Sequence, residues 1–463
     1  MTGRPAAVPP ASATAPVPAL VTDLYELTMA AAYQAHGIEH EATFELSVRR
    51  MPGPRRFLVA GGLEDALAGL EAFAFGADDV AYLAGLDLFP ARFLDHLADL
   101  RFTGEIWAVA EGEVVFGGEP LVRVTGPLVE AQLVETFLLN TVASRTTLAS
   151  KAARVALACG DRHFLDFSAR RDHGVDAAMA AARAAWIAGA AGTSLVAAGR
   201  RWGIPVAGTM AHSFVMAFDD ERDAFRAYAR CFPRGVVLLI DTYDTVQGAV
   251  NAVEVGRELA GEGIHIAGVR LDSGDLDVLS RQVRDVLDDA GLHDVDILAS
   301  GDLDEHRIHA LRTAGAPIDS FGVGTQLGTS ADAPALGAVY KLVEDADGPK
   351  MKLAEGKVTL PGRKQVWRRD GPDGADVVGL HDEDLPGRPL LRRVMAGGRR
   401  VDRPEPLSAV RERCTGAIAA LPEPLRALEP ADGPVWPVET SPGLQALVDT
   451  VRRGRVAAGR GGR

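Results

Sequence analysis

Polar and charged side chains follow six predicted β-strands, each at the point where the strand ends. The segments are residues 166–173, 208–213, 241–244, 270–275, 300–302 and 321–325. A turn capped by Asp or Ser explains any single segment. All six together indicate one shared polar mouth, because the carboxyl ends of parallel strands meet at the same face of an α/β barrel.

Glycines and arginines in these segments are suited to binding an anion. The Gly-Val-Gly-Thr run at 322–325 has little side-chain bulk, so its backbone N–H groups can cradle a phosphate. Arginines at other strand ends offer paired N–H donors, although a surface salt bridge is the alternative for each. The predicted anion site comprises Arg170, Arg171, Arg270, Gly301, Gly322, Gly324 and Thr325.

Carboxylates occur at the same strand ends, namely Asp241, Asp244, Asp272, Asp275 and Asp302. Carboxylates beside a phosphate site need a cation between them, and Mg²⁺ binds one or two carboxylates together with substrate phosphates. Helix capping accounts for some of them, with Asp244 and Asp275 the first candidates. The mouth therefore suits a magnesium complex of a polyphosphate or pyrophosphate.

His212 has the placement of a nucleophile, since it follows a strand and precedes Ser213. A lone histidine is more often packed or capping, and His163 and His173 are competitors for the role.

The elements that must position these residues are strands alternating with helices after residue 160. Seven strands are predicted, at 163–167, 193–196, 205–208, 236–240, 266–271, 296–299 and 319–323. Such alternation predicts a parallel sheet with right-handed connections. No Gly-x-Gly-x-x-Gly follows the first strand, so a closed barrel is favoured over a dinucleotide-binding sheet.

An α+β block precedes this region and short strands follow it. Before it we predict strands at 43–48, 57–60, 105–109, 113–116 and 121–124, a helix after Asp23, a helical stretch at 63–100 and a long helix from Pro127 to Ala158. After it we predict strands at 338–343, 350–354, 366–369 and 377–380, which return to the N-terminal block, and then one or two helices.

Composition limits the class of protein. The chain has 463 residues and a net charge of −14, with 47% hydrophobic and 24% charged residues, which is typical of a soluble globular protein. Its length suggests two domains, or one large barrel with an appendage. The acidic balance disfavours nucleic acid, and no apolar run is long enough to span a membrane. Three cysteines at unrelated spacings and no signal peptide favour the cytoplasm. Residues 1–19 are expected to be disordered, and residues 452–463 form a basic tail or a phosphate-binding arm.

Several of these strings resemble the nicotinate phosphoribosyltransferase family. The matching segments are Thr-Asp-Leu-Tyr-Glu-Leu-Thr-Met at 22–29, Ser-Ala-Arg-Arg at 168–171, Gly-Thr-Met-Ala-His-Ser at 208–213, Ile-Asp-Thr-Tyr-Asp at 240–244, Val-Arg-Leu-Asp-Ser-Gly-Asp at 269–275 and Phe-Gly-Val-Gly-Thr at 321–325. The resemblance covers residues 20–345 and fades towards the C-terminus.

The resemblance implies a type II phosphoribosyltransferase fold, an irregular seven-stranded α/β barrel with an N-terminal α+β open sandwich. It implies that nicotinate and 5-phosphoribosyl 1-diphosphate give nicotinate mononucleotide and pyrophosphate, in NAD biosynthesis. ATP hydrolysis is coupled to this reaction through a phosphorylated histidine, matched by His212. A homodimer is also implied.

The resemblance also implies roles for individual residues. Tyr25 matches an aromatic that stacks on the pyridine ring from a neighbouring subunit, and Arg270 with Thr209 matches the nicotinate contacts. Arg170 matches a residue beside the phosphoribosyl and pyrophosphate groups, and Gly324 with Thr325 matches the 5′-phosphate loop. Asp272 and Asp302 are the candidates for ribose and magnesium contacts, with Asp272 also assigned to catalysis. The predicted substrate contacts are completed by Arg171, Ser213, Asp241, Gly301 and Gly322.

Two positions depart from the family pattern and leave alternatives open. Asp172-His173-Gly174 replaces a Gly-Pro-Asp-Gly-like run, and Leu195 stands where Asn is common. The alternatives are nicotinamide or quinolinate phosphoribosyltransferase, or a non-catalytic phosphate sensor on the same barrel. The expected divisions are 1–19, 20–145, 146–335, 336–400 and 401–463.

Overall fold

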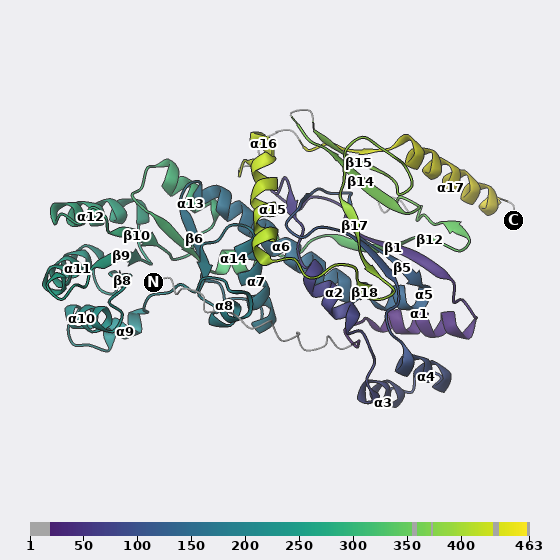
Figure 1. Ribbon diagram of the computed structural model, residues 1–463, viewed down its shortest axis with the longest axis horizontal. Helices are drawn as coiled ribbons and strands as arrows, with labels where there is room; N and C mark the ends of the chain where they lie inside the picture. The colour runs from purple at the N-terminus through teal and green to yellow at the C-terminus, as the bar shows by residue number, and fades with distance from the viewer. Residues whose placement is uncertain (1–18, 354–358, 372–373, 429–434, 461–463) are drawn as a thin grey trace. The chain divides into compact units, whose positions relative to one another are not determined.

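The structure is a computed structural model that describes residues 19–353, 359–371, 374–428 and 435–460 (Figure 1). The expected disordered segment 1–19 lies outside the described residues except for Ala19, which is buried. The chain forms two compact units. Among the described residues, the first unit comprises residues 148–334, and the second comprises residues 19–147 together with those from 335 to 460.

A parallel sheet of six strands forms the centre of the first unit, in the order β7-β6-β11-β10-β9-β8. Its strands are β6 (His163–Asp166), β7 (Gly192–Thr193), β8 (Val236–Leu239), β9 (Ile266–Leu271), β10 (Asp296–Ala299) and β11 (Ser320–Val323). The predicted strand at 205–208 is reduced to one parallel bridge between Thr193 and Val206. The mixed α/β class is confirmed, with six strands and this bridge in place of seven full strands.

Helices connect the consecutive strands of this unit, and a last short helix follows β11. They are α7 (Val175–Ile187), α8 (Val196–Trp202), α9 (His212–Met216), α10 (Glu221–Cys231), α11 (Thr245–Ala260), α12 (Leu276–Asp289), α13 (Glu305–Thr313) and α14 (Thr325–Gly328). In Figure 1, α10, α11 and α12 pack beside β8, β9 and β10. Asp244 caps α11 by accepting from the Gln247 N–H at 2.8 Å, and Asp275 caps α12. The capping interpretation of both aspartates is therefore confirmed.

The second unit is built on a seven-stranded sheet of order β13-β12-β1-β5-β3-β17-β18. These strands are β1 (Glu41–Val48), β3 (Glu105–Val109), β5 (Pro120–Pro127), β12 (Ala338–Asp345), β13 (Gly348–Pro349), β17 (Leu391–Ala396) and β18 (Arg399–Arg400). β1 pairs antiparallel with both β5 and β12, and the Phe44 and Tyr340 rings stack at 4.9 Å across the second pair. The unit's apolar core is therefore shared by early and late parts of the chain.

Three helices replace the single helical stretch predicted at 63–100. They are α2 (Leu63–Glu71), α3 (Ala77–Gly85) and α4 (Ala91–Asp99). Gly76 and Pro90 occupy the N-cap positions of α3 and α4, and proline cannot lie in a helix interior without losing a hydrogen bond. The helix after Asp23 is α1 (Leu24–Ala35), and the one after Pro127 divides into α5 (Leu128–Leu133) and α6 (Glu135–Cys159).

Smaller elements complete the second unit. β2 (Leu58–Val59) pairs with β4 (Val114–Val115), and a four-stranded sheet contains β14 (Lys364–Arg369), β15 (Ala375–Leu380), β16 (Arg388–Pro389) and β19 (Val438–Thr440). The strand predicted at 350–354 is wrong for its described residues, 350–353, because the strand pairing ends at Pro349. The late helices are α15 (Leu407–Ala420), α16 (Glu423–Arg426) and α17 (Pro442–Arg460). Among the described helices, none has the length and apolar character that a membrane crossing requires.

Candidate active site

A polar hollow of about 220 Å³ opens at the carboxyl ends of β6, β9, β10 and β11. It lies wholly within the first unit. Its lining includes nine of the predicted site residues, namely Arg170, Arg171, Arg270, Asp272, Gly301, Asp302, Gly322, Gly324 and Thr325. Phe167 and Ser300 complete the lining. The parallel register thus brings together residues up to about 155 positions apart in the sequence.

Arg270 lines the hollow and is held by four hydrogen bonds. Its Nε donates to Ser300 Oγ at 2.8 Å and its Nη2 to Asp272 Oδ1 at 2.8 Å. Its Nη1 makes longer contacts with Thr209 Oγ1 at 3.3 Å and with the Met210 carbonyl at 3.4 Å. Since a guanidinium has five N–H groups and four are used here, two-point binding of a carboxylate would need one of the longer contacts to be given up.

Asp272 stays ionised in this setting. Burial by itself raises the pKa of the Asp272 carboxyl, but the Ser300 hydrogen bond and the Arg270 charge outweigh it and hold the pKa below its ordinary value. The Ser300 hydroxyl donates to Asp272 Oδ1 at 2.5 Å. A carboxylate is therefore available beside the guanidinium at neutral pH.

Gly301 and Gly322 let the backbone and rings approach closely around the hollow. Gly301 has φ +91°, and a Cβ placed there would lie 1.9 Å from the Asp272 carbonyl oxygen. The next residue, Asp302, also has positive φ, at 46°. A Cβ at Gly322 would meet the Phe167 ring at 2.5 Å. Only glycine fits the first position, because its conformation and its space both exclude a side chain.

A buried hydrogen-bond network beneath Arg170 and Arg171 supports their loop. Asp166 accepts from Ser168 Oγ at 2.6 Å and from Thr193 Oγ1 at 2.7 Å. Ser168 Oγ also lies 3.0 Å from Asp172 Oδ2. Burial raises the pKa of Asp172 to about 6, so this carboxyl exchanges its proton close to neutral pH.

The Asp172 carboxyl also lies against the helix that follows the glycine loop. A Cβ at Gly328 would come within 1.6 Å of Asp172 Oδ1. The arginine loop and α14 are therefore packed against each other through this pair.

His212 begins α9 and reaches the same strand ends from outside the lining. Its Nδ1 lies 3.2 Å from Thr242 Oγ1, and its Nε2 lies 3.8 Å from Asp272 Oδ2. Asp241 accepts from the Asp272 N–H at 2.9 Å and from Ser273 Oγ at 2.6 Å. The segments after β8 and β9 and the start of α9 thus form one connected group.

Two predicted residues are not joined to this group. Ser213 lies next to His212 and is exposed, with no side-chain contact to the lining that the described structure records. Tyr25 belongs to the second unit, on α1, where its ring is 47% exposed. Sequence reasoning also missed Phe167, Ser300 and Thr242, although each stands inside a strand-end segment that it had singled out.

A magnesium ion is compatible with the lining. Within the described residues, no group of three or more His, Cys, Asp or Glu is arranged as a self-sufficient metal site. Mg²⁺ does not require one when substrate phosphates supply the other ligands. Asp272 and Asp302 both line the hollow, so their oxygens fit the one or two carboxylates that such a complex needs.

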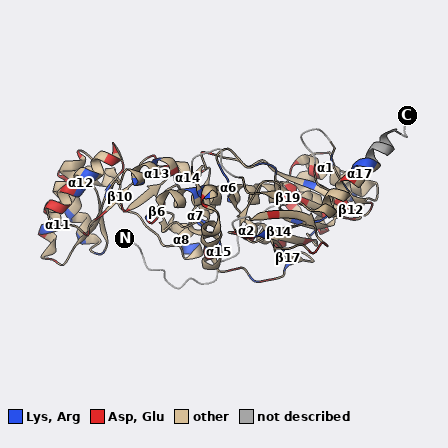
Figure 2. Ribbon diagram, turned by 90° about the horizontal axis from the view of Figure 1, so that it is seen from above, with Lys and Arg blue, Asp and Glu red and all other residues tan. Residues whose placement is uncertain are grey.

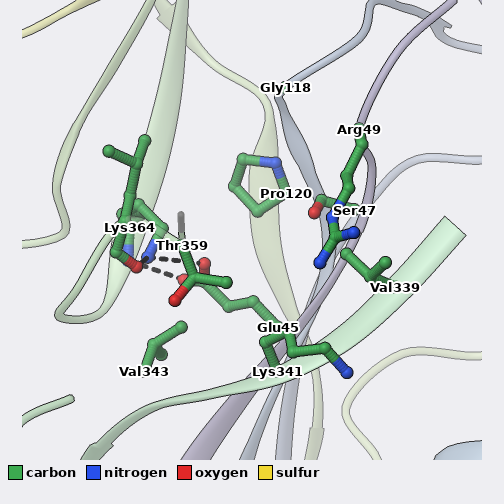
Figure 3. Close-up of a pocket in the computed structure, with 11 residues that line it drawn as sticks. Glu45, Ser47, Arg49, Gly118, Pro120, Val339, Lys341, Val343, Thr359 and Lys364 are labelled. Atoms are coloured by element: carbon green, nitrogen blue, oxygen red, sulfur yellow. Dashed lines mark hydrogen bonds and ion pairs between the residues drawn. The ribbon is translucent and has the colours of Figure 1, made fainter. Parts of the chain in front are cut away.

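A second hollow, of about 200 Å³, lies in the second unit on β1, β5 and β12. Figure 3 shows its charged side chains Arg49, Lys341, Glu45 and Lys364. Lys364 Nζ pairs with Glu45 Oε2 at 2.8 Å, and burial lowers the pKa of Lys364 even though Glu45 opposes this. With three cations and one carboxylate in its lining, this hollow is basic.

Comparison with known proteins identifies the family. Residues 20–143 match the nicotinate phosphoribosyltransferase N-terminal domain, and residues 162–344 match the nicotinate phosphoribosyltransferase family model. The chain belongs to the nicotinate phosphoribosyltransferase family.

Similar proteins extend this assignment over most of the chain. It is 50% identical over 428 residues to a nicotinate phosphoribosyltransferase of Mycobacterium tuberculosis, covering 92% of each chain. It is 47% identical over 385 residues to that of Bacillus subtilis, covering 81% of this chain and 78% of the relative. The structure of human nicotinic acid phosphoribosyltransferase superposes with a TM-score of 0.83 at 32% identity, covering 93% of this chain and 99% of the human one.

Proposed function

We propose that the chain is an ATP-coupled nicotinate phosphoribosyltransferase of NAD biosynthesis. It joins nicotinate to 5-phosphoribosyl 1-diphosphate and releases nicotinate mononucleotide and pyrophosphate, while ATP becomes ADP and phosphate. Family membership supports the reaction class.

The observation that carries the proposal is the composition of the hollow in the first unit. It places three arginines, two carboxylates and a glycine-rich loop around one space of about 220 Å³. A substrate with a 5′-phosphate, a ribose and a pyrophosphate needs that mixture of anion donors and cation ligands. We assign Gly322, Gly324 and Thr325 to the 5′-phosphate, and Arg170, Arg171 and Gly301 to the pyrophosphate side.

Nicotinate carries a carboxylate that Arg270 can bind, with Thr209 beside it at 3.3 Å from the guanidinium. The pyridine nitrogen is the nucleophile, so no strong general base is needed. Displacement at the anomeric carbon develops positive charge on the ribose, as in glycoside chemistry. We assign the ionised Asp272 carboxylate to stabilising that positive charge. Burial raises the pKa of Asp272, but the Ser300 hydrogen bond and the Arg270 charge lower it more, so the carboxyl is ionised.

Asp272 and Asp302 would hold Mg²⁺ together with substrate phosphates, and the bound ion would neutralise negative charge on the leaving pyrophosphate. Asp241 supports this arrangement by accepting from the Asp272 N–H at 2.9 Å. His212 acts in energy coupling, as the residue that receives the γ-phosphoryl group of ATP, with Ser213 beside it.

We further propose that two copies form the working enzyme. Tyr25 is exposed on α1 of the second unit, and we assign its ring to the neighbour's pyridine site. The proposed fold is the seven-stranded irregular barrel with an N-terminal open sandwich, divided at 20–145, 146–335, 336–400 and 401–463. A cytoplasmic setting suits the substrates and the three cysteines without a disulfide pattern.

A paired assay tests the function. Nicotinate and nicotinamide are each offered with 5-phosphoribosyl 1-diphosphate, with and without ATP, and the product mass is measured. We expect nicotinate mononucleotide to form fastest with nicotinate and ATP. Faster turnover of nicotinamide contradicts the substrate. Binding of 5-phosphoribosyl 1-diphosphate without pyrophosphate release indicates the non-catalytic phosphate sensor. ATP-independent turnover of quinolinate with release of carbon dioxide indicates a quinolinate phosphoribosyltransferase.

The role of His212 has its own prediction. His212→Ala should keep slow transfer and lose the stimulation by ATP, because the histidine takes part in phosphoryl coupling and not in bond formation to the ribose. The measurement compares the transfer rate with and without ATP in the variant and in the unmodified enzyme. Undiminished ATP stimulation in His212→Ala rules out the coupling role.

A further inference from the structure

The two ring nitrogens of His212 face different surroundings. Nδ1 lies 3.2 Å from the Thr242 hydroxyl oxygen, which is hydrogen-bonding distance. Nε2 lies 3.8 Å from Asp272 Oδ2, which is too long for a hydrogen bond. Among the described residues, only Nδ1 therefore has a hydrogen-bond partner, and Nε2 lies at ion-pair distance from Asp272 without making a hydrogen bond.

Thr242 lies in a segment whose neighbouring aspartates are anchored by hydrogen bonds. Asp241, just before it, accepts from the Asp272 N–H at 2.9 Å and from Ser273 Oγ at 2.6 Å. Asp244, two residues later, caps α11 through the Gln247 N–H at 2.8 Å. The Thr242 hydroxyl, carried on this anchored segment, can orient the His212 ring that it contacts.

A threonine hydroxyl can donate or accept, so it can accept the proton carried by Nδ1. Asp272 does not compete for the ring's proton at hydrogen-bonding distance, because its Oδ1 accepts from Arg270 and Ser300 while its Oδ2 stays 3.8 Å from the ring. With the proton on Nδ1, the lone pair is on Nε2.

Nε2 of His212 also lies on the side of the polar hollow. Asp272, which Nε2 approaches, lines the polar hollow, whereas Thr242 does not. A phosphoryl group on Nε2 enters that side without breaking the Thr242 contact. Phosphorylation of Nδ1 would displace the threonine.

We propose that Thr242 is a positioning residue that holds Nδ1 of His212 and makes Nε2 the atom that takes the phosphoryl group. This inference rests on the proposed function. The Nε2 lone pair forms a bond to the γ-phosphorus of ATP, and the bond from that phosphorus to the bridging oxygen breaks. Its electron pair leaves with ADP, and the Nδ1 proton stays on the ring, in contact with Thr242.

The first measurement locates the phosphate in the unmodified enzyme. The full chain is incubated with ATP and Mg²⁺, and ³¹P NMR, with chromatography of an alkaline digest against both phosphohistidine isomers, identifies the nitrogen. We expect phosphate on Nε2. Phosphate mainly on Nδ1 overturns the proposal, whereas no phosphohistidine at all contradicts the proposed coupling function itself.

The second measurement uses Thr242→Val, which keeps the shape and removes the hydroxyl, with Thr242→Ser as the matched control. We expect Thr242→Val to lower the rate of phosphohistidine formation about ten-fold, the scale of one hydrogen bond, and to place part of the phosphate on Nδ1. Thr242→Ser should stay within about two-fold of the unmodified enzyme, because it retains the hydroxyl.

The comparison of the variants separates orientation from folding. Melting temperatures of the valine and serine variants are measured alongside, and a purely structural role predicts no change in which nitrogen carries the phosphate. Equal rates and the same isomer in the valine and serine variants overturn the proposal. Loss of rate in Thr242→Val, rescue in Thr242→Ser and a shift in isomer support it.

Discussion

At the scale of single residues, Arg270 combines a buried charge with a nearly complete set of partners. Its side chain is 11% exposed and bonds to Ser300 and Asp272 at 2.8 Å each. The planar fork makes these bonds in fixed directions, which a lysine ammonium cannot reproduce. Substitution therefore changes both ligand binding and the state of Asp272.

Arg270→Lys should lower kcat/KM for nicotinate by about 10- to 100-fold, since hydrogen bonds to charged groups contribute about 1.5–3 kcal/mol each. Steady-state kinetics with varied nicotinate provide the measurement. Arg226→Lys, at an exposed arginine paired with Glu258 on the helical surface, is the matched control and should leave the kinetics unaltered. A variant at Arg270 that binds nicotinate normally would remove this residue from the site.

Asp172 links stability to pH. Burial raises its pKa to about 6, the nearby Asp166 charge adds to this, and the Ser168 hydrogen bond and His173 oppose it. A carboxyl whose pKa is raised on folding stabilises the fold at pH below its unfolded pKa of about 3.9, and that contribution is lost as the pH rises through about 6.

Asp172→Asn should therefore abolish the loss of folding stability that occurs as the pH rises through about 6. Its melting temperature relative to the unmodified protein should rise between pH 4.5 and pH 7.5, as determined by thermal unfolding. Asp219→Asn, at an exposed position, serves as the control. A difference in melting temperature that is flat or falls with pH between Asp172→Asn and the unmodified chain contradicts the assignment. Figure 2 shows acidic and basic residues spread over α11 and α12, and the control accounts for such general surface charge.

The charged members of the hollow were predictable because charge at a strand end is visible in the sequence. Phe167, Ser300 and Thr242 were missed because neither an aromatic nor a hydroxyl stands out there. Their importance comes from register and contact. Ser300 directly follows β10, the strand beside the one that carries Arg270, and the Phe167 ring lies 5.5 Å from that guanidinium. The substrate roles of the predicted residues stay predictions.

At the scale of elements, the turn after β10 depends on a single glycine. Gly301 combines φ +91° with a close approach of the chain, since a Cβ at this position would lie 1.9 Å from the Asp272 carbonyl oxygen. Gly291, after α12, has φ +75° with open space around it. The pair separates the cost of a left-handed conformation from the cost of a steric clash.

Both Gly→Ala variants should be destabilised by about 1–2 kcal/mol through the positive φ. Gly301→Ala should lose about 1–3 kcal/mol more, because the added methyl must displace a backbone carbonyl. Urea unfolding gives the two free energies, and kcat/KM should fall for Gly301→Ala alone. Equal stability and activity of the two variants would show that the turn at Gly301 accommodates a methyl group without cost.

Element positions were predicted well where short apolar runs lie between turn residues. β3, at Glu105–Val109, and β9, at Ile266–Leu271, have the predicted bounds. The strand predicted at 205–208 was wrong because pairing with a neighbouring strand determines its length, and only one bridge forms there. The single helical stretch predicted at 63–100 was wrong because Pro90 interrupts it. Hydrophobic periodicity does not reveal how many partners a strand finds.

At the scale of the whole molecule, net charge and local charge act differently. The chain carries −14 overall, yet the hollow gathers Arg170, Arg171 and Arg270 against Asp272 and Asp302. At physiological salt, dissolved ions screen the interaction between exposed charges beyond about 8–10 Å. The charges that line the hollow therefore determine how strongly an anion binds there. An acidic chain is therefore compatible with highly anionic small substrates.

The path of the chain through the second unit makes a prediction about truncation. β12 pairs with β1, and β17 pairs with β3, so strands after residue 335 complete a sheet begun before residue 130. A chain ending at residue 334 leaves β1 and β3 each with an open edge, and unpaired edges promote aggregation. Fragment 1–334 should therefore be insoluble when expressed alone, as judged by fractionation and size-exclusion chromatography.

Co-expression with fragment 335–463 should restore a soluble complex, because strand pairing needs the register seen between Leu46 and Tyr340 and not a covalent link. The control is a register-disrupting proline, Tyr340→Pro, in the second fragment, which removes a backbone donor from the strand and should abolish rescue. A fragment 1–334 that is monomeric and unfolds cooperatively would mean that the early strands are self-sufficient. The late strands would then be an addition to the second unit and not a part of its core.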